Sequence, residues 1–179
     1  MQIRECARDL GQNGRGALER LYELAGARLL RYALALTRNQ HDAEDVLQAA
    51  LVRIALRPRG LAAARHPWAY CLRVVRNEAI DTIRGRRSAP LMAAPLDAES
   101  DVSSLFEDQE LRQAVRVALR QLHPAQSEVV VLKVWEQMTF VEIADVLSES
   151  PNTVASRYRY AMARLTRLLQ PLCNEVLYD

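Results

Sequence analysis

Apolar side chains recur at intervals of three and four residues through most of this chain, and this spacing favours a helical fold. In the N-terminal part, the pattern predicts a helix over residues 17–36, or two helices in series that meet near Gly26. The cleanest amphipathic pattern covers residues 43–54, and Asp42 is placed to cap the start of that helix. We therefore expect packed helices at the beginning of the chain.

Two breaks interrupt this periodicity. The first is short: Pro58 and Gly60 end the pattern, and a new apolar stripe begins at Pro67 and ends near Gly85. The second break covers residues 88–104, which carry two prolines, small residues and acids without sustained periodicity. That composition is typical of a flexible linker rather than of a packed element.

Helical spacing resumes after the second break, over residues 111–122, and stops before Pro124. Residues 129–135 are rich in β-branched side chains and fit a buried strand on propensity alone, but their helical neighbours favour a helix. We expect an all-α chain with two small helical domains, residues 1–87 and 107–179, joined by a flexible linker at residues 88–106.

The second block contains the pattern of a helix-turn-helix. Thr139 and Glu142 form a capping box that starts a short helix, and Ser150 can cap a long helix whose first residue is Pro151. This layout is typical of DNA-reading domains, although a plain helical hairpin with a solvated polar face has the same pattern. The polar N-terminal face of the long helix offers candidate DNA contacts at Asn152, Thr153, Ser156, Arg157, Arg159 and Tyr160.

Basic and aromatic residues alternate around the predicted helix that starts at Pro67. Single-stranded nucleic acid is bound by this combination, because bases stack on aromatic rings while arginines hold phosphates. Trp68 fits equally well in the core, so Tyr70 is the better candidate for an accessible ring. The candidate nucleic-acid contacts are Arg65, Tyr70, Arg73, Arg76, Asn77 and Arg84.

Acidic and amide side chains lie on the polar side of the helix predicted over residues 43–54. No partner that would shift a carboxyl pKa is nearby in the sequence, so acid–base catalysis is a poor explanation for them. A solvated face or a protein-docking face is the better interpretation, and its members are Asp42, Glu44, Asp45 and Gln48.

Composition excludes several other classes of protein. The three cysteines lack the spacing of a zinc site and the even number of a disulfide framework, and the three histidines are scattered singly. We therefore expect no metal, no cofactor and no catalysis, and a helical enzyme or scaffold is the weakest alternative. No run of about 18 apolar residues is present, so we expect no membrane insertion and a cytoplasmic location.

Five segments, taken in order, resemble sigma-70 family initiation factors. Residues 42–48 (DAEDVLQ) resemble the AEDLVQ-type motif of sigma region 2.2, and residues 68–84 resemble the "WLY…RN-AID-R" signature of regions 2.3 and 2.4. Residues 122–126 resemble the "LP-xQR" start of region 4, and residues 140–144 with 152–157 resemble its "EIA…TV-SR" reading head. Having regions 2 and 4 alone is typical of the extracytoplasmic-function (ECF) group.

This resemblance implies a role for each candidate surface. The carboxylate helix would dock on the clamp helices of the largest subunit of bacterial core RNA polymerase. The Trp68 to Arg87 helix would open the −10 promoter element, the Pro151 helix would read the −35 element, and the linker would thread into the polymerase. The family also implies an anti-sigma factor as a partner.

The chain departs from the family pattern in its second block, with Ser127 for the usual Arg, Ser148-Glu149 for Gly-Ile and Ala155 for a basic residue. One alternative is a helix-turn-helix regulator that acts without polymerase. It predicts tight promoter binding by the isolated chain, whereas a sigma factor binds weakly until polymerase is present. The region 2 motifs favour the sigma factor.

Overall fold

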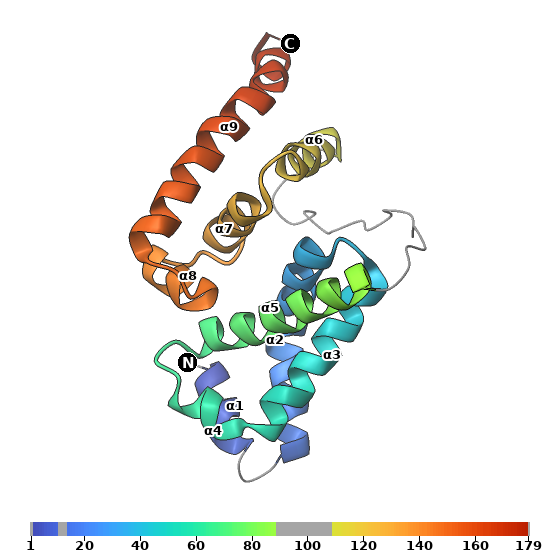
Figure 1. Cartoon of the computed structure of the whole chain (residues 1–179), viewed down its shortest axis with the longest axis vertical. Helices are drawn as coiled ribbons and strands as arrows, with labels where there is room; N and C mark the ends of the chain where they lie inside the picture. The colour runs from blue at the N-terminus through green and yellow to red at the C-terminus, as the bar shows by residue number, and fades with distance from the viewer. Residues whose placement is uncertain (1, 11–13, 89–108, 179) are drawn as a thin grey trace. The chain divides into compact units, whose positions relative to one another are not determined.

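A computed structural model of the protein describes residues 2–10, 14–88 and 109–178. Within these residues the chain is all-α, as expected, and divides into two compact units (Figure 1). The first unit contains α1 (Gln2–Asp9), α2 (Gly14–Thr37), α3 (Gln40–Leu56), α4 (Pro58–Ala63) and α5 (Pro67–Ser88). The helices that follow are α6 (Gln109–Arg120), α7 (Pro124–Val134), α8 (Phe140–Leu147) and α9 (Pro151–Tyr178).

The core of the first unit lies between α2, α3 and α5, which pack against one another. Burying each large aliphatic side chain contributes roughly 1.5–3 kcal/mol, so this core supplies most of the unit's stability. Its fully buried side chains include Leu21, Leu29, Tyr32, Ile54, Leu61 and Leu72.

Helix α2 is one continuous helix, which decides between the two predictions for residues 17–36. Gly26 is buried within it, and a Cβ at this position would lie 2.9 Å from the Tyr22 ring. The glycine therefore gives the tyrosine ring room to lie along the helix and does not mark a joint.

The start of α3 differs from the prediction. The helix begins at Gln40, and its N-cap is Asn39, whose side chain accepts a 3.0 Å hydrogen bond from the Asp42 N–H. The predicted cap at Asp42 is wrong because the helix and its cap both lie three residues earlier in the chain. Asp42 is instead only 5% exposed, so its carboxylate needs a partner inside the fold.

Helix α5 is held to α3 by two ion pairs on its packing side. Arg86 Nη2 lies 2.5 Å from Asp42 Oδ1 at the C-terminal end of α5, and Arg53 Nε on α3 lies 2.6 Å from Glu78 Oε1. Both carboxylates are nearly buried, whereas both arginines are half-exposed. Together the pairs connect both ends of α3 to α5.

Two short helices in the first unit were not predicted. The segment between Arg57 and His66, where Pro58 and Gly60 predict a break in the helical pattern, contains α4, which begins at Pro58 and buries Leu61. Proline suits this position because its missing N–H is not needed in a first helical turn. Helix α1 packs on α2 and α4, and the Arg4 guanidinium donates a 2.8 Å hydrogen bond to the Arg65 carbonyl.

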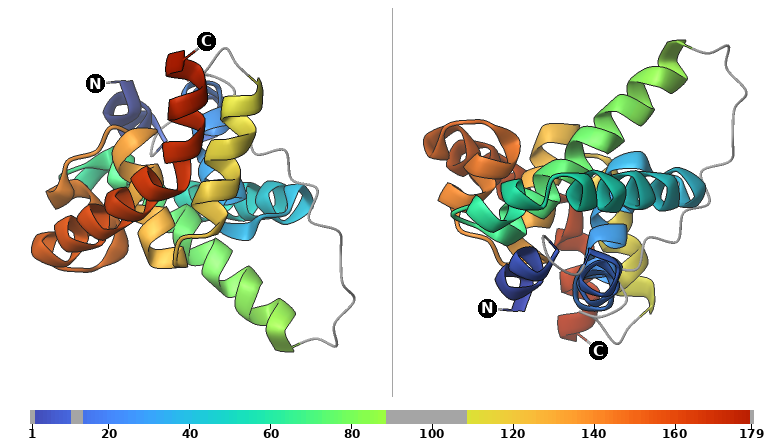
Figure 2. Two further views of the ribbon diagram at one scale, coloured as in Figure 1. Left: turned by 90° about the horizontal axis from the view of Figure 1, so that it is seen from above. Right: turned by 90° about the horizontal axis from the view of Figure 1, so that it is seen from below.

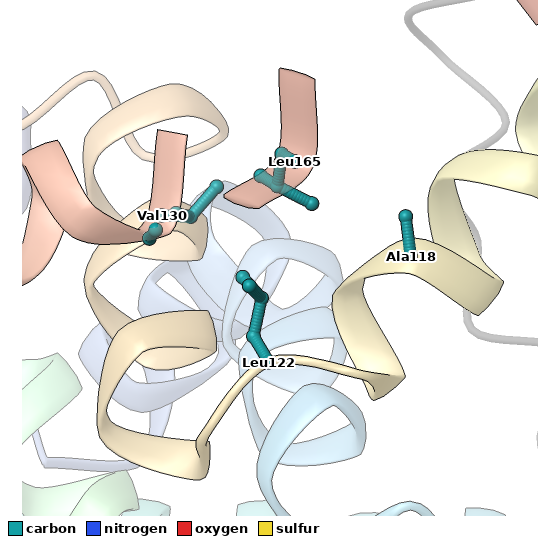
Figure 3. Close-up of a cluster of buried hydrophobic side chains, with 5 residues drawn as sticks. Ala118, Leu122, Val130 and Leu165 are labelled. Atoms are coloured by element: carbon teal, nitrogen blue, oxygen red, sulfur yellow. The ribbon is translucent and has the colours of Figure 1, made fainter. Parts of the chain in front are cut away.

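The second unit has a smaller core built from α6, α7 and α9, and α6 lies alongside α9 (Figure 2). Leu122, Val130 and Leu165 point toward one another in this core, with Ala118 beside them (Figure 3). Helix α7 begins at Pro124 and includes Val129 and Val130, so the helical prediction for this β-branched run is confirmed and the strand alternative is wrong.

The helix-turn-helix prediction is confirmed in its local geometry. The capping box is present: the Thr139 N–H donates to Glu142 Oε2 at 2.8 Å, and the Glu142 N–H donates to Thr139 Oγ1 at 3.3 Å. Ser150 caps α9 by accepting a 3.1 Å bond from the Thr153 N–H. Between the helices, Ser148 adopts the left-handed conformation, with φ 56°.

Helical spacing predicts an inward apolar stripe on α9 made of Val154, Ala155, Tyr158, Ala161, Met162, Leu165, Leu168 and Leu169. In the structure Val154, Ala161 and Leu165 are buried. Met162 is an exception: it was predicted to face inward, but it is exposed.

The predicted linker at residues 88–106 falls almost wholly outside the described residues. None of the described helices is long and apolar enough to cross a membrane. In the part of the chain that the structure describes, His, Cys, Asp and Glu side chains form no group of three that could hold a metal ion.

Candidate nucleic-acid and protein interfaces

Three of the four carboxylate-face residues lie on the exposed side of α3. Glu44, Asp45 and Gln48 are exposed, and the Gln40 side chain donates a 2.6 Å hydrogen bond to Glu44. Asp42 lies apart from them, because it is buried and paired with Arg86. The structure therefore separates one structural carboxylate from a group that is available to a partner.

This exposed side of α3 continues into apolar side chains that the sequence reasoning missed. Val52 and Leu56 follow Asp45 and Gln48 at helical spacing on the same face, and they are 51% and 77% exposed. Their signal in the sequence is that both fall outside the buried stripe of the helix. We define the docking face as Glu44, Asp45, Gln48, Val52 and Leu56.

Four of the six residues predicted around α5 share one face of that helix. Tyr70, Arg73, Asn77 and Arg84 recur at helical spacing opposite the buried stripe. The Arg73 guanidinium lies over the Tyr70 ring at 5.7 Å from its centroid, which is within cation–π range. An aromatic ring with adjacent cations is suited to stacking a base beside a phosphate.

The remaining two residues lie elsewhere. Arg65 is exposed in the segment before α5, and Arg76 is turned toward the packed side of the helix and is only partly exposed. Trp68 is half-buried beneath Arg28, whose guanidinium carbon lies 4.3 Å from the ring centroid. Both Trp68 and Tyr70 are therefore partly covered, and only Tyr70 lies on the same face as Arg73, Asn77 and Arg84.

The six residues predicted on α9 fall on two neighbouring faces. Asn152, Ser156 and Arg159 share the outer face, where Arg159 Nη2 donates a 3.4 Å hydrogen bond to Ser156 Oγ. Thr153, Arg157 and Tyr160 share the face nearer the turn, and Tyr160 is 67% exposed. All six lie between Pro151, where α9 begins, and Tyr160.

Arg157 has a partner in the turn. Its Nη2 lies 2.9 Å from Glu149 Oε1, and the two side chains are 31% and 35% exposed. The sequence reasoning placed both residues near the DNA-facing end but did not predict the ion pair. Their separation in the sequence is twice the usual spacing of a helical pair, so periodicity gave no signal.

The buried thiol of Cys71 lies on the packed side of α5, and burial raises its pKa to about 12. A thiol with so high a pKa is neutral and unreactive at neutral pH, which fits a core residue rather than a nucleophile. The exposed surfaces described above carry charge and aromatic rings, which are features of binding.

Two family models match the chain. The model described as Sigma-70 region 2 matches residues 21–89, which include α3 and α5, and the model described as Sigma-70, region 4 matches residues 112–165, which include the helix-turn-helix. The two matched segments include the docking face, the face of α5 that carries Tyr70, Arg73, Asn77 and Arg84, and the start of α9.

Named relatives and solved structures agree with these models. The chain is 39% identical to an RNA polymerase sigma-E factor of Streptomyces avermitilis over 79% of each chain. It is 31% identical to the ECF RNA polymerase sigma factor SigM of Mycobacterium tuberculosis, over 87% of this chain and 78% of the relative.

The fold is similar to that of CnrH, solved in complex with the cytosolic domain of CnrY, with a TM-score of 0.72 and 24% identity over 96% of this chain and 99% of that one. The sigma factor RpoE of Bartonella quintana, solved with the anti-sigma factor NepR, has a TM-score of 0.65 and 20% identity over 85% and 96%. Order of motifs, helical architecture and sequence identity together place this chain in the ECF group of the sigma-70 family of RNA polymerase sigma factors.

Proposed function

We propose that this chain binds bacterial core RNA polymerase in the cytoplasm, directs it to promoters with paired −35 and −10 elements, and performs no chemistry itself. The observation that carries the proposal is the presence in one chain of an exposed docking face on α3 and two separate arginine-bearing faces on α5 and α9. In this proposal residues 1–87 dock and open the −10 element, residues 107–179 read the −35 element, and residues 88–106 link them.

Docking on the polymerase uses the α3 face. Its N-terminal half offers the carboxylates of Glu44 and Asp45 for basic side chains, and its C-terminal half offers the apolar side chains of Val52 and Leu56. A polar rim next to exposed apolar residues is the composition of a protein interface. Asp42 supports this face indirectly, by its ion pair with Arg86.

The −10 element is bound by the face of α5. Tyr70 stacks on an unpaired base while Arg73, Asn77 and Arg84 hold the single strand, at an unstacking cost of a few kcal/mol that these contacts offset. Arg65 and Arg76 flank this surface and add positive charge at its edges.

The −35 element is read as duplex by the start of α9. Asn152 and Arg159 are placed to contact base edges from the outer face, and Thr153, Ser156, Arg157 and Tyr160 contact the backbone or neighbouring bases. Each domain binds weakly alone, and the linker makes the second contact effectively intramolecular once the first has formed.

An anti-sigma factor is the remaining partner that we propose. The RpoE neighbour was solved with such a protein, and the exposed apolar residues Val52 and Leu56 are suited to being covered by a partner when polymerase is not bound.

The proposal is tested by promoter-dependent transcription with purified chain, bacterial core polymerase and genomic fragments, with transcript starts mapped. New starts that share paired upstream elements are expected. The double variant Glu44→Ala with Asp45→Ala should lose these starts and its co-elution with core polymerase, whereas Glu19→Ala, an exposed carboxylate on α2, is the matched control. Absence of starts and of co-elution would instead favour a regulator that binds duplex DNA alone.

A further inference from the structure

The turn of the helix-turn-helix carries a carboxylate that contacts one of the arginines assigned to DNA. Glu149 has its backbone fixed by an N–H bond of 3.1 Å to the Ala144 carbonyl, directly after the left-handed residue Ser148. From there its carboxylate reaches Arg157 at 2.9 Å. Side chains on a helix lean toward its N-terminus, so Arg157 extends back along α9 to meet it.

This pair occupies a defined side of α9. Thr153, one turn before Arg157, is also engaged on that side, because its hydroxyl lies 2.8 Å from the Ser150 hydroxyl. Asn152 and Arg159 lie on the other, outer face and remain exposed. The helix therefore presents one face that is available to bases and one whose guanidinium is already bound.

We propose that Glu149 is a positioning residue that withholds Arg157 from the phosphates of DNA and so lowers the affinity of α9 for duplex of any sequence. The inference rests on the proposed −35 function. A carboxylate and a phosphate compete for the same fork of guanidinium donors, so the pair must open before Arg157 can hold a phosphate. Because both side chains are about one-third exposed, the ion pair is weak enough for DNA to open it.

The consequence for promoter selection follows from the two-domain arrangement. A sequence-independent phosphate contact strengthens binding to promoter and non-promoter duplex alike. Withholding that contact keeps the second domain weak on its own, so stable binding requires both promoter elements.

The test is a double-mutant cycle in the full chain: parent, Glu149→Gln, Arg157→Ala and the double variant. Binding is measured on a duplex carrying the upstream element of a mapped promoter and on an unrelated duplex, between 50 and 200 mM salt. Glu149→Gln should bind both duplexes more tightly, and its affinity should fall about threefold more over this salt range, the amount expected for one added phosphate contact. In the Arg157→Ala background the same change should leave the salt dependence unaltered.

Asp145→Asn is the matched control, because it removes an exposed carboxylate from the neighbouring helix α8. It should leave the salt dependence unchanged both in the parent and in the Arg157→Ala background. Circular dichroism of each variant establishes that the helices are retained.

Two results would overturn the inference while leaving the proposed function intact. One is a parent holoenzyme that initiates at its promoters together with a Glu149→Gln variant whose affinity and salt dependence equal the parent's. The other is an equal gain from Glu149→Gln with and without Arg157, which would mean that the carboxylate repels DNA directly. A parent holoenzyme that initiates nowhere would remove the proposed function, and this inference with it.

Discussion

Helices α5 and α9 are both assigned to nucleic acid, yet they use arginine–carboxylate pairs differently. In α5 the pairs Asp42–Arg86 and Arg53–Glu78 lie on the side that packs on α3, and Arg73 and Arg84, which we propose contact DNA, lie on another face. In α9 the paired arginine is itself one of the residues assigned to DNA. The first arrangement positions a helix, whereas the second controls a contact.

The two helices also differ in how they pack on their neighbouring helices. Helix α5 packs on α2 and α3 and buries Leu72 completely. Helix α9 packs on α6 and α7 through a small cluster that includes Ala161 and Leu165. Among the described residues, the first unit therefore has the larger buried core.

The largest expected effect comes from emptying the two cores. Leu72→Ala should destabilise the first unit by about 3–5 kcal/mol, and Leu165→Ala should cost the second unit about 2–3 kcal/mol, because a shallow cluster collapses more easily around the missing atoms. Unfolding of the first unit in urea is followed by Trp68 fluorescence in a Trp135→Phe background. Unfolding of the second unit is followed by Trp135 fluorescence in a Trp68→Phe background. Equal losses of stability in the two units would contradict the difference in packing between them.

A smaller effect is expected from Asp42→Asn. This change removes the negative charge that pairs with Arg86 and leaves an amide in a buried position. The free energy of unfolding of the first unit should therefore fall by about 1–3 kcal/mol. Glu44→Ala, on the exposed side of the same helix, should cost less than about 0.5 kcal/mol. The same urea titrations measure both. If Asp42→Asn were as stable as Glu44→Ala, the ion pair would not hold α5 in place.

The turn of the second unit offers a change of opposite sign. Ser148→Gly should stabilise that unit by about 1 kcal/mol, because the left-handed backbone at this position strains any residue with a Cβ. Ser150→Ala, which removes the N-cap of α9, should destabilise it by about 1 kcal/mol. Thermal unfolding monitored at Trp135 compares the two. A loss of stability in Ser148→Gly would contradict the strain argument.

The smallest effect at neutral pH involves Cys71, which is buried in the first unit. Burial raises the pKa of its thiol from 9.0 to about 12, so the folded state keeps the proton that the unfolded state loses. Its contribution is complete below pH 9 and is lost as pH rises toward 12, at up to about 1.4 kcal/mol per pH unit. Stability measured from pH 7 to 11 should fall less steeply in Cys71→Ala. A parallel decline in both proteins would show that another group titrates.

Much of the fold could be predicted from local patterns. Helical periodicity located α2, α3, α5 and α9, and the capping box at Thr139 and the Ser150-Pro151 start of α9 are signals within a few residues of each other. Helix α4 was missed because Pro58 and Gly60 suggest a break, whereas here proline starts a helix and the glycine fits beneath the Tyr70 hydroxyl.

The sequence by itself determined most of the helical segments, though not α1 or α4, and the position of the helix-turn-helix, because these properties depend on neighbours along the chain. Only the tertiary structure decided that Asp42 is buried against Arg86, that Val52 and Leu56 remain exposed, and that Glu149 holds Arg157. Burial and ion pairing depend on which helices meet and on the path of a turn. Both are set by packing between residues that are distant in the sequence, and periodicity does not encode them.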